Sequence, residues 1–197
     1  MPSPLRALSC IALLGGAGLL AACAGPDGAA AISQTPAATP TAARNQPEPV
    51  PMPAAPDAKA PVALKLATVD GGTFDAVAHR GSWLVVNFWA TWCHPCLAEM
   101  PELSQLDQRR ADLGVLGLAY DDISPAELKA FLAAHPVSYP IAQVDVDDPP
   151  TAFEAPTGLP TTYLLDRQGR IAGRFVGPVT AHDIEQVVDG ARDGRLP

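Results

Sequence analysis

The sequence predicts an α/β domain in which a central mixed sheet is flanked by helices. Two nearly continuous apolar runs, at 84–89 and 115–120, are typical of buried strands that are covered on both faces. An amphipathic stretch at 95–110 separates them, which predicts a crossover helix and parallel pairing of the two strands. A hairpin and an amphipathic closing segment follow, so we expect a βαβ unit and then a ββα unit.

Short segments that favour strands are bounded by turn residues along the whole domain. The strands expected are at about 63–68, 73–77, 84–89, 115–120, 161–166 and 171–176. The turn Asp70-Gly71-Gly72 separates the first pair, and the sequence Asp-Arg-Gln-Gly-Arg at 166–170 separates the last pair. Both pairs are therefore expected to form hairpins.

Three helices are expected, each with a recognisable start or face. The helix at 95–110 has apolar residues on one side, namely Leu97, Met100, Leu103 and Leu106. A second helix begins with a capping sequence at Ser124 and ends near Pro136. A third begins at Thr180, with Asp183 three residues later as the second half of its cap.

A pair of cysteines lies where the buried strand 84–89 becomes the helix 95–110. A helix start offers unpaired N–H groups and the positive end of the helix dipole, so Cys93 is expected to be stabilised as the thiolate nucleophile. Cys96 follows about one turn later and is placed to resolve a mixed disulfide by closing a ring with Cys93. Pro95 suits the first helical turn. The sequence therefore predicts redox chemistry.

Structural and metal-binding roles fit the sequence less well than redox chemistry does. A purely structural disulfide of this span closes almost no loop and constrains the unfolded chain little. A zinc site needs about two more soft ligands, and the sequence has no second such cysteine pair. The acidic run 145–148 lacks the glycine of a calcium loop, and Pro156 stands where its closing glutamate belongs. We expect a solvated turn there, and neither a metal nor a cofactor.

The first residues predict an export signal. Arg6 precedes an apolar stretch that is too short and too rich in glycine for a transmembrane anchor. The sequence Leu-Ala-Ala-Cys at 20–23 resembles the lipobox of bacterial lipoproteins, which implies removal of residues 1–22 and lipidation of Cys23. Ala24 is not the aspartate that retains such proteins at the inner membrane, so the resemblance favours the outer membrane.

The rest of the chain divides into a tether and a globular part. Residues 23–61 are rich in proline and alanine and contain no aromatic residue, so we expect a disordered tether that begins at the lipidated cysteine. Every aromatic residue falls within 62–197, which we expect to be one domain. The net charge of −8 argues against nucleic acid as a partner.

The order of these motifs is that of the thioredoxin fold, with C-x-P-C at the first strand-to-helix turn and Gly-Leu-Pro-Thr at 158–161 before a later strand. The sequences at 86–93 and 99–103 resemble the TlpA/ResA-like family of membrane-tethered, periplasm-facing thiol-disulfide oxidoreductases. The stretch 121–155 is similar to the strand and helix inserted in that family. The resemblance covers nearly all of 62–197.

The resemblance implies roles for further residues around the dithiol. Pro160 matches the family's cis proline, which lies against the dithiol, and Leu159 before it is then a substrate-contacting position. Trp92 is expected to supply an apolar wall beside Cys93. His94 departs from the small or varied residue of the family. A charged His94 would favour the Cys93 thiolate and make the disulfide more oxidising, whereas a neutral, exposed one would do little.

Asn87 occupies the position at which thioredoxin has a buried acid that assists proton transfer at the resolving thiol. Asparagine cannot titrate, so the proton route is left open by the sequence. Glu99 and Glu154 are the candidate substitutes, and the alternative for each is an ordinary surface carboxylate.

The function predicted is that of a lipid-anchored enzyme that reduces selected disulfides in exported proteins. Since the periplasm is held oxidising, the resemblance implies a transmembrane thiol reductase as electron donor, and clients such as apocytochrome c or a copper-site protein. Two alternatives stay open. One is an oxidase that works in the other direction, and the other is a chaperone that holds Cu(I) on the two thiolates, with Met100 as the nearest soft side chain.

Overall fold

The computed structural model describes residues 60–193. The predicted signal peptide, the lipidation site Cys23 and nearly all of the predicted tether lie outside the described residues. Those assignments therefore stay predictions. Within 60–193, no helix is both long enough and apolar enough to cross a membrane.

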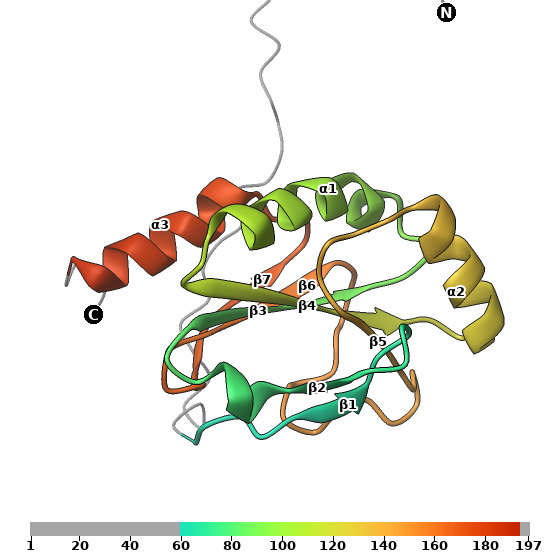
Figure 1. The fold of residues 1–197 in the computed structure, drawn as a ribbon, viewed down its shortest axis with the longest axis horizontal. Helices are drawn as coiled ribbons and strands as arrows, with labels where there is room; N and C mark the ends of the chain where they lie inside the picture. Colours follow the sequence, from blue (N-terminus) through green and yellow to red (C-terminus); the bar gives the residue numbers. More distant parts are fainter. Residues whose placement is uncertain (1–59, 194–197) are drawn as a thin grey trace, which may run out of the picture. The chain divides into compact units, whose positions relative to one another are not determined.

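Five strands form a mixed sheet in the order β5-β4-β3-β6-β7 (Figure 1). They are β3 (Trp83–Trp89), β4 (Leu113–Tyr120), β5 (Ile141–Val144), β6 (Thr161–Leu165) and β7 (Ile171–Val176). The strands β3, β4 and β5 are parallel to their neighbours in this group, β6 is antiparallel to β3, and β7 is antiparallel to β6. The predicted mixed sheet and the parallel pairing of the two apolar runs are confirmed.

Helices cover one face of this sheet. The α-helices of the described residues are α1 (His94–Arg109), α2 (Pro125–Ala134) and α3 (Ala181–Arg192), and a 3₁₀ helix spans Ala76–His79. Figure 1 shows α1 and α3 over the same face of the sheet. One core cluster joins β3 to all three α-helices, and its fully buried members include Val85, Trp89, Leu103, Leu128 and Ile184. Burial of apolar area on this face is the main contribution that holds α1 on the sheet.

The opposite face is covered by the N-terminal hairpin. This hairpin consists of β1 (Lys65–Ala67) and β2 (Thr73–Asp75), which pair antiparallel below the sheet in Figure 1. Alternate residues of β3, namely Leu84, Val86 and Phe88, face a second core cluster on this side. Residues of β3 therefore point alternately to the helices and to the hairpin, and Asn87 takes a position on the helix side.

Local signals placed the helix ends correctly. The side chains of Ser124 and Glu127 form a capping box at α2, and those of Thr180 and Asp183 form one at α3, as predicted.

The second strand is shorter than expected because the Asp75 side chain accepts a hydrogen bond from the Val77 amide and starts a 3₁₀ turn. The predicted insertion proves to consist of α2 and β5, which extends the sheet beyond β4.

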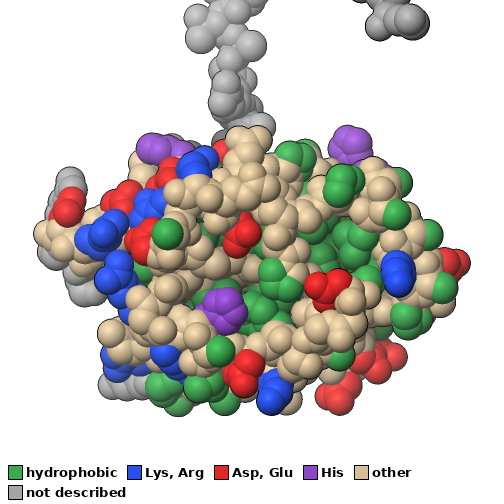
Figure 2. All heavy atoms as spheres, viewed as in Figure 1, with side chains coloured by type: hydrophobic (Ala, Val, Ile, Leu, Met, Phe, Trp, Pro, Cys, Tyr) green, Lys and Arg blue, Asp and Glu red, His purple; other side chains and the backbone are tan. Residues whose placement is uncertain are grey.

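Ion pairs join the C-terminal end of α1 to α3. Arg110 lies 2.9 Å from Asp112 and 3.0 Å from Asp189, and Arg109 lies 2.8 Å from Glu185. Hydrogen bonds from the Arg110 guanidinium lower the pKa of both aspartates. Figure 2 shows basic and acidic side chains interspersed on this part of the surface and hydrophobic side chains gathered on the part near α2. The charged network therefore belongs to the end of α1 that is remote from its N-terminus.

Candidate redox site

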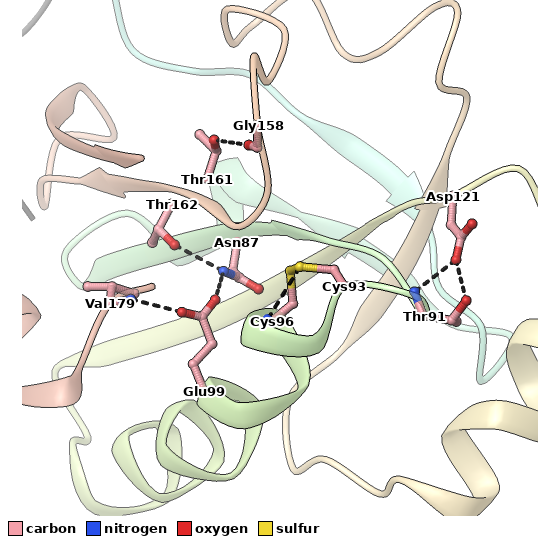
Figure 3. The surroundings of a disulfide bond; sticks show 10 residues. All are labelled: Asn87, Thr91, Cys93, Cys96, Glu99, Asp121, Gly158, Thr161, Thr162 and Val179. Carbon is pink, nitrogen blue, oxygen red and sulfur yellow. Dashed lines mark hydrogen bonds between the residues drawn. A yellow bond between two sulfur atoms is a disulfide. The ribbon is translucent and has the colours of Figure 1, made fainter. Parts of the chain in front are cut away.

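The two cysteines of the C-x-P-C sequence form a disulfide at the N-terminus of α1 (Figure 3). Cys93 is the N-cap residue, and its Sγ accepts a hydrogen bond of 3.3 Å from the Cys96 amide. Cys93 keeps 4% of its surface exposed, whereas Cys96 is fully buried. An incoming sulfur therefore reaches Cys93 first, which supports the predicted division into nucleophile and resolving thiol.

The loop that leads into α1 is fixed by a carboxylate at the end of the neighbouring strand. Asp121 follows β4, is buried, and accepts hydrogen bonds from the Thr91 amide (2.8 Å) and the Thr91 hydroxyl (2.5 Å). Two residues after Thr91, the chain reaches Cys93. The carboxylate thus holds the backbone that delivers the first sulfur, and it satisfies polar groups that would otherwise be buried without partners.

A buried glutamate lies one turn after the disulfide. Glu99 is 4% exposed, and its two carboxylate oxygens accept hydrogen bonds from different elements (Figure 3). Oε1 accepts from Asn87 Nδ2 of β3 at 2.8 Å, and Oε2 accepts from the Val179 amide ahead of α3 at 2.9 Å. Asn87 Nδ2 also donates to Thr162 Oγ1 of β6 at 3.0 Å. The strand β3 and the segment ahead of α3 thus contact this carboxylate of α1 directly, and β6 contacts it through Asn87.

Burial changes the acidity of Glu99. Desolvation of the charged form raises the pKa of Glu99 to about 7, and the hydrogen bonds from Val179 and Asn87 oppose that rise. The nearby Glu102 carboxylate adds to the rise because it is a like charge. A carboxyl group with such a pKa gains and loses a proton near neutral pH, which is what a general acid or base requires.

The loop before β6 contains a cis peptide bond between Leu159 and Pro160. Pro160 is buried, and Thr161 Oγ1 donates a hydrogen bond of 2.7 Å to the Gly158 carbonyl across this turn. The cis isomer is therefore present at the residue to which the family resemblance assigned it.

An apolar hollow of about 580 Å³ lies beside this loop. Its lining includes Trp92, Tyr120, Ile123, Val146, Pro156 and Leu159. The Trp92 side chain is 70% exposed, so it is a surface element of the hollow rather than part of the core. The predicted substrate-contacting Leu159 and the predicted apolar wall Trp92 are thus brought to the same hollow.

The remaining predicted residues divide between the site and the surface. His94 is the first residue of α1 and is exposed, and Pro95 follows it in the first turn, as expected. Glu154 is 68% exposed and pairs with Arg174 of β7, so of the two candidate carboxylates only Glu99 is buried beside Asn87. The alternative that Glu99 is an ordinary surface carboxylate is wrong.

Sequence reasoning missed three contributors to the site: Asp121, Thr162 and the Val179 amide. Asp121 had a usable signal, because it stands at the carboxyl end of a strand next to the one that leads to the dithiol, where parallel sheets place their functional groups. Thr162 and Val179 had none, since they are 75 and 80 residues away from the partners that they bind.

A profile of the AhpC/TSA family matches residues 53–174, which is more than half of the chain. The chain belongs to the AhpC/TSA family. This AhpC/TSA family member is 32% identical over 129 residues to the thioredoxin-like protein YneN of Bacillus subtilis, a match that covers 64% of this chain and 75% of YneN. It is 30% identical over 107 residues to the thiol-disulfide oxidoreductase ResA of Bacillus cereus, which covers 54% of this chain and 61% of ResA.

The fold of a solved structure agrees with these sequence matches. The thiol:disulfide interchange protein of the thioredoxin family from Chlorobium tepidum has a TM-score of 0.58 and 27% identity to this AhpC/TSA family member. The match covers 74% of this chain and 98% of that one. The thioredoxin-like fold and the resemblance to ResA-like proteins are confirmed, and so is the prediction of a thiol-disulfide oxidoreductase at this level of description.

Proposed function

We propose that this chain reduces disulfide bonds of exported proteins through its Cys93-Cys96 dithiol. The observation that carries the proposal is the disulfide at the start of α1 with a buried, readily titrated carboxyl one turn behind it. The names of the relatives support the reaction class. A structural disulfide needs no such carboxyl group. Burial of a carboxyl group costs stability, so its presence beside the disulfide favours a role in the reaction.

The reaction is an exchange of sulfur–sulfur bonds. The Cys93 thiolate attacks one sulfur of a client disulfide, a Cys93–client bond forms, and the second client sulfur leaves as a thiolate. Cys96 then gives up its proton and attacks Cys93, which breaks the mixed disulfide and releases the first client sulfur. The client gains two electrons, the enzyme forms the Cys93–Cys96 bond, and a dithiol protein is needed to reduce that bond again.

Two features of the site assist these steps. The Cys96 amide donates to Cys93 Sγ, and the start of α1 adds the positive end of its dipole, so negative charge on Cys93 is stabilised. Glu99 is the group proposed to take the proton from Cys96 and later return it, because it is buried near the dithiol and has a pKa of about 7. His94 is exposed and is assigned a minor electrostatic role.

Client binding is proposed at the hollow beside the cis peptide bond. An extended client segment would pair with the backbone next to Pro160, and its apolar side chains would contact Trp92 and Leu159. Exposure of Trp92 supports this use, because a large, exposed aromatic residue in an apolar hollow is typical of a contact surface.

The site of action is proposed from the resemblance to lipoproteins. A signal at 1–22, a lipid on Cys23 and a tether through residue 61 would hold the domain at the periplasmic side of a membrane, with the outer membrane favoured. There a transmembrane thiol reductase would supply electrons, and apocytochrome c or a copper-site protein would be a client. Replacement of Cys23 by Ser is expected to release the protein from the membrane fraction.

Direction and clients are tested by two measurements. A reduction potential near or below about −220 mV supports the reductase, whereas one around −120 mV supports an oxidase. Cys96→Ser in the native host is expected to accumulate mixed disulfides on Cys93, and the matched control Cys93→Ser is expected to accumulate none. An empty trap, together with a Cys93→Ser strain that is indistinguishable from the wild type, would overturn the proposal.

A further inference from the structure

The side chain of Asn87 lies between the carboxylate of Glu99 and the Cys96 side chain (Figure 3). Asn87 is fully buried in the middle of β3. Both hydrogen-bond donors of its Nδ2 are used, one by Glu99 Oε1 at 2.8 Å and one by Thr162 Oγ1 at 3.0 Å. A buried asparagine on a strand that is otherwise apolar therefore has a defined set of partners.

These partners fix the orientation of the carboxamide. If the amide were turned over, its oxygen would face a carboxylate oxygen of Glu99, and two acceptors would repel each other. The oxygen Oδ1 must therefore point away from Glu99, and Figure 3 shows it on the side of the disulfide. The strand backbone and Thr162 leave the side chain little freedom to turn.

Asn87 Oδ1 is a buried polar atom without a partner among the described residues. It is buried and accepts no hydrogen bond from any of residues 60–193. Such an acceptor costs stability unless some state of the protein supplies a donor. The disulfide supplies none, because neither sulfur has a proton. Reduction breaks the sulfur–sulfur bond, and the fully buried sulfur, Cys96, then carries a thiol proton that it can donate to an acceptor.

We propose that Asn87 is a positioning residue that couples Glu99 to the dithiol, its Nδ2 holding the carboxylate in place while its Oδ1 accepts a hydrogen bond from the Cys96 thiol of the reduced protein, directly or through one water. This inference rests on the proposed function for its use in catalysis. Asn87, which cannot titrate, thus positions Glu99, which can.

The coupling acts in the resolving step. Cys96 passes its proton to the Glu99 carboxylate, a bond forms between the Cys96 and Cys93 sulfurs, and the Cys93–client bond breaks to leave a client thiolate. Before the step, the Asn87 carboxamide binds both groups. Its Oδ1 accepts from the Cys96 thiol, and its Nδ2 donates to the Glu99 carboxylate. The other groups that act on Glu99 are the Val179 amide and the like charge of Glu102. Tyr139 also lies within electrostatic reach of Glu99, and its hydroxyl is buried and unpaired among the described residues.

The main test compares Asn87→Leu with Val85→Ala. Leucine has the same branched arrangement of side-chain heavy atoms as asparagine but has neither Nδ2 nor Oδ1. Val85 is fully buried on the same strand and the same face as Asn87 and has no polar side-chain group, so its truncation weakens the core without altering the proposed coupling. Each purified protein is equilibrated with glutathione, which requires no client, and its dithiol-to-disulfide ratio is measured.

Two results are expected for Asn87→Leu. The equilibrium should shift toward the disulfide by about tenfold, equivalent to about 30 mV, because the reduced thiol loses its acceptor. The pH midpoint for resolution of a mixed disulfide with a small thiol should move to higher pH, because the Glu99 carboxylate loses a donor. Val85→Ala should show neither shift. Equal values for the two variants in both measurements would overturn the inference.

A second measurement covers the case in which Asn87→Leu does not fold. In the wild-type protein, the ¹⁵N-labelled side-chain amide of Asn87, assigned with Asn87→Asp, should change its NMR shift on reduction and titrate together with Glu99. A signal that responds to neither would overturn the coupling. Absence of protein disulfide reductase activity in the wild type, with both Asn87 responses present, would instead overturn the proposed function alone.

Discussion

Glu99 lies in surroundings that are unusual for its residue type. A glutamate on a helix normally faces water, yet this one is buried and is held by Asn87 and the Val179 amide. Its position one turn behind Cys96 places it near the proton that must leave in the resolving step. The sequence alone left Glu99 and Glu154 as equal candidates, and burial distinguishes them.

Replacement of Glu99 by Gln is expected to slow resolution of a mixed disulfide by about 10²-fold near neutral pH, since a general base contributes about that much. The wild-type rate should rise with pH to a plateau, with a midpoint near 7, as the carboxyl group loses its proton. Stopped-flow measurement from pH 5 to 9 checks both. A variant that keeps the wild-type midpoint would show that another group titrates.

The same residue predicts how stability depends on pH. The pKa of Glu99 is raised in the folded protein from 4.5 to about 7. Between these two pH values, the folded state therefore binds more protons than the unfolded state. The free energy of unfolding should therefore fall by up to about 3 kcal/mol as pH rises from about 4.5 to 7. Urea titrations of the oxidised protein should show this fall, and those of Glu99→Gln should show much less of it.

At the scale of elements, the junction of β4 with the loop before α1 is held by Asp121. Its replacement by Ala leaves the amide and the hydroxyl of Thr91 without their acceptor, which should cost about 1–3 kcal/mol of stability. Exchange at Cys93 should also slow, because the loop that presents it loosens. Chemical denaturation and glutathione exchange rates measure the two effects.

The control variants for Asp121 come from the same loop. Asp122→Ala alters an exposed neighbour and should change neither quantity by more than a small amount. Asp121→Asn retains an acceptor for Thr91 and should recover much of the stability. If Asp121→Asn were as unstable as Asp121→Ala, the hydrogen bonds to Thr91 would not be the cause of the loss.

Elements with local signals could be predicted from the sequence, and those defined by distant partners could not. The caps at Ser124 and Thr180 and the apolar side of α1 are visible within a few residues of sequence. The short strand β5 is bounded by Pro140 and becomes a strand through pairing with β4. The contact of Asn87 with Thr162 likewise depends on the antiparallel pairing of β3 with β6. No local pattern encodes such pairings.

At the scale of the whole molecule, the two ends of α1 perform separate tasks. The N-terminal end bears the disulfide, whereas Arg110 and its acidic partners tie the other end to α3. Arg110→Met should lower the free energy of unfolding by about 1 kcal/mol, and less at high salt, because the pairs are partly exposed. The reduction potential should stay unchanged within error. A large shift in potential would mean that the two ends are coupled.

The hydrogen bond from the Val179 amide to Glu99 has a consequence for observation. A backbone N–H that points at a single ionising carboxylate reports the charge on that carboxylate through its proton chemical shift. Val179 lies ahead of α3, far along the chain from either cysteine, so labelling it alters nothing at the sulfurs. The Val179 amide resonance in a two-dimensional spectrum therefore reports the protonation of Glu99 in the unmodified protein while the two cysteines are oxidised or reduced.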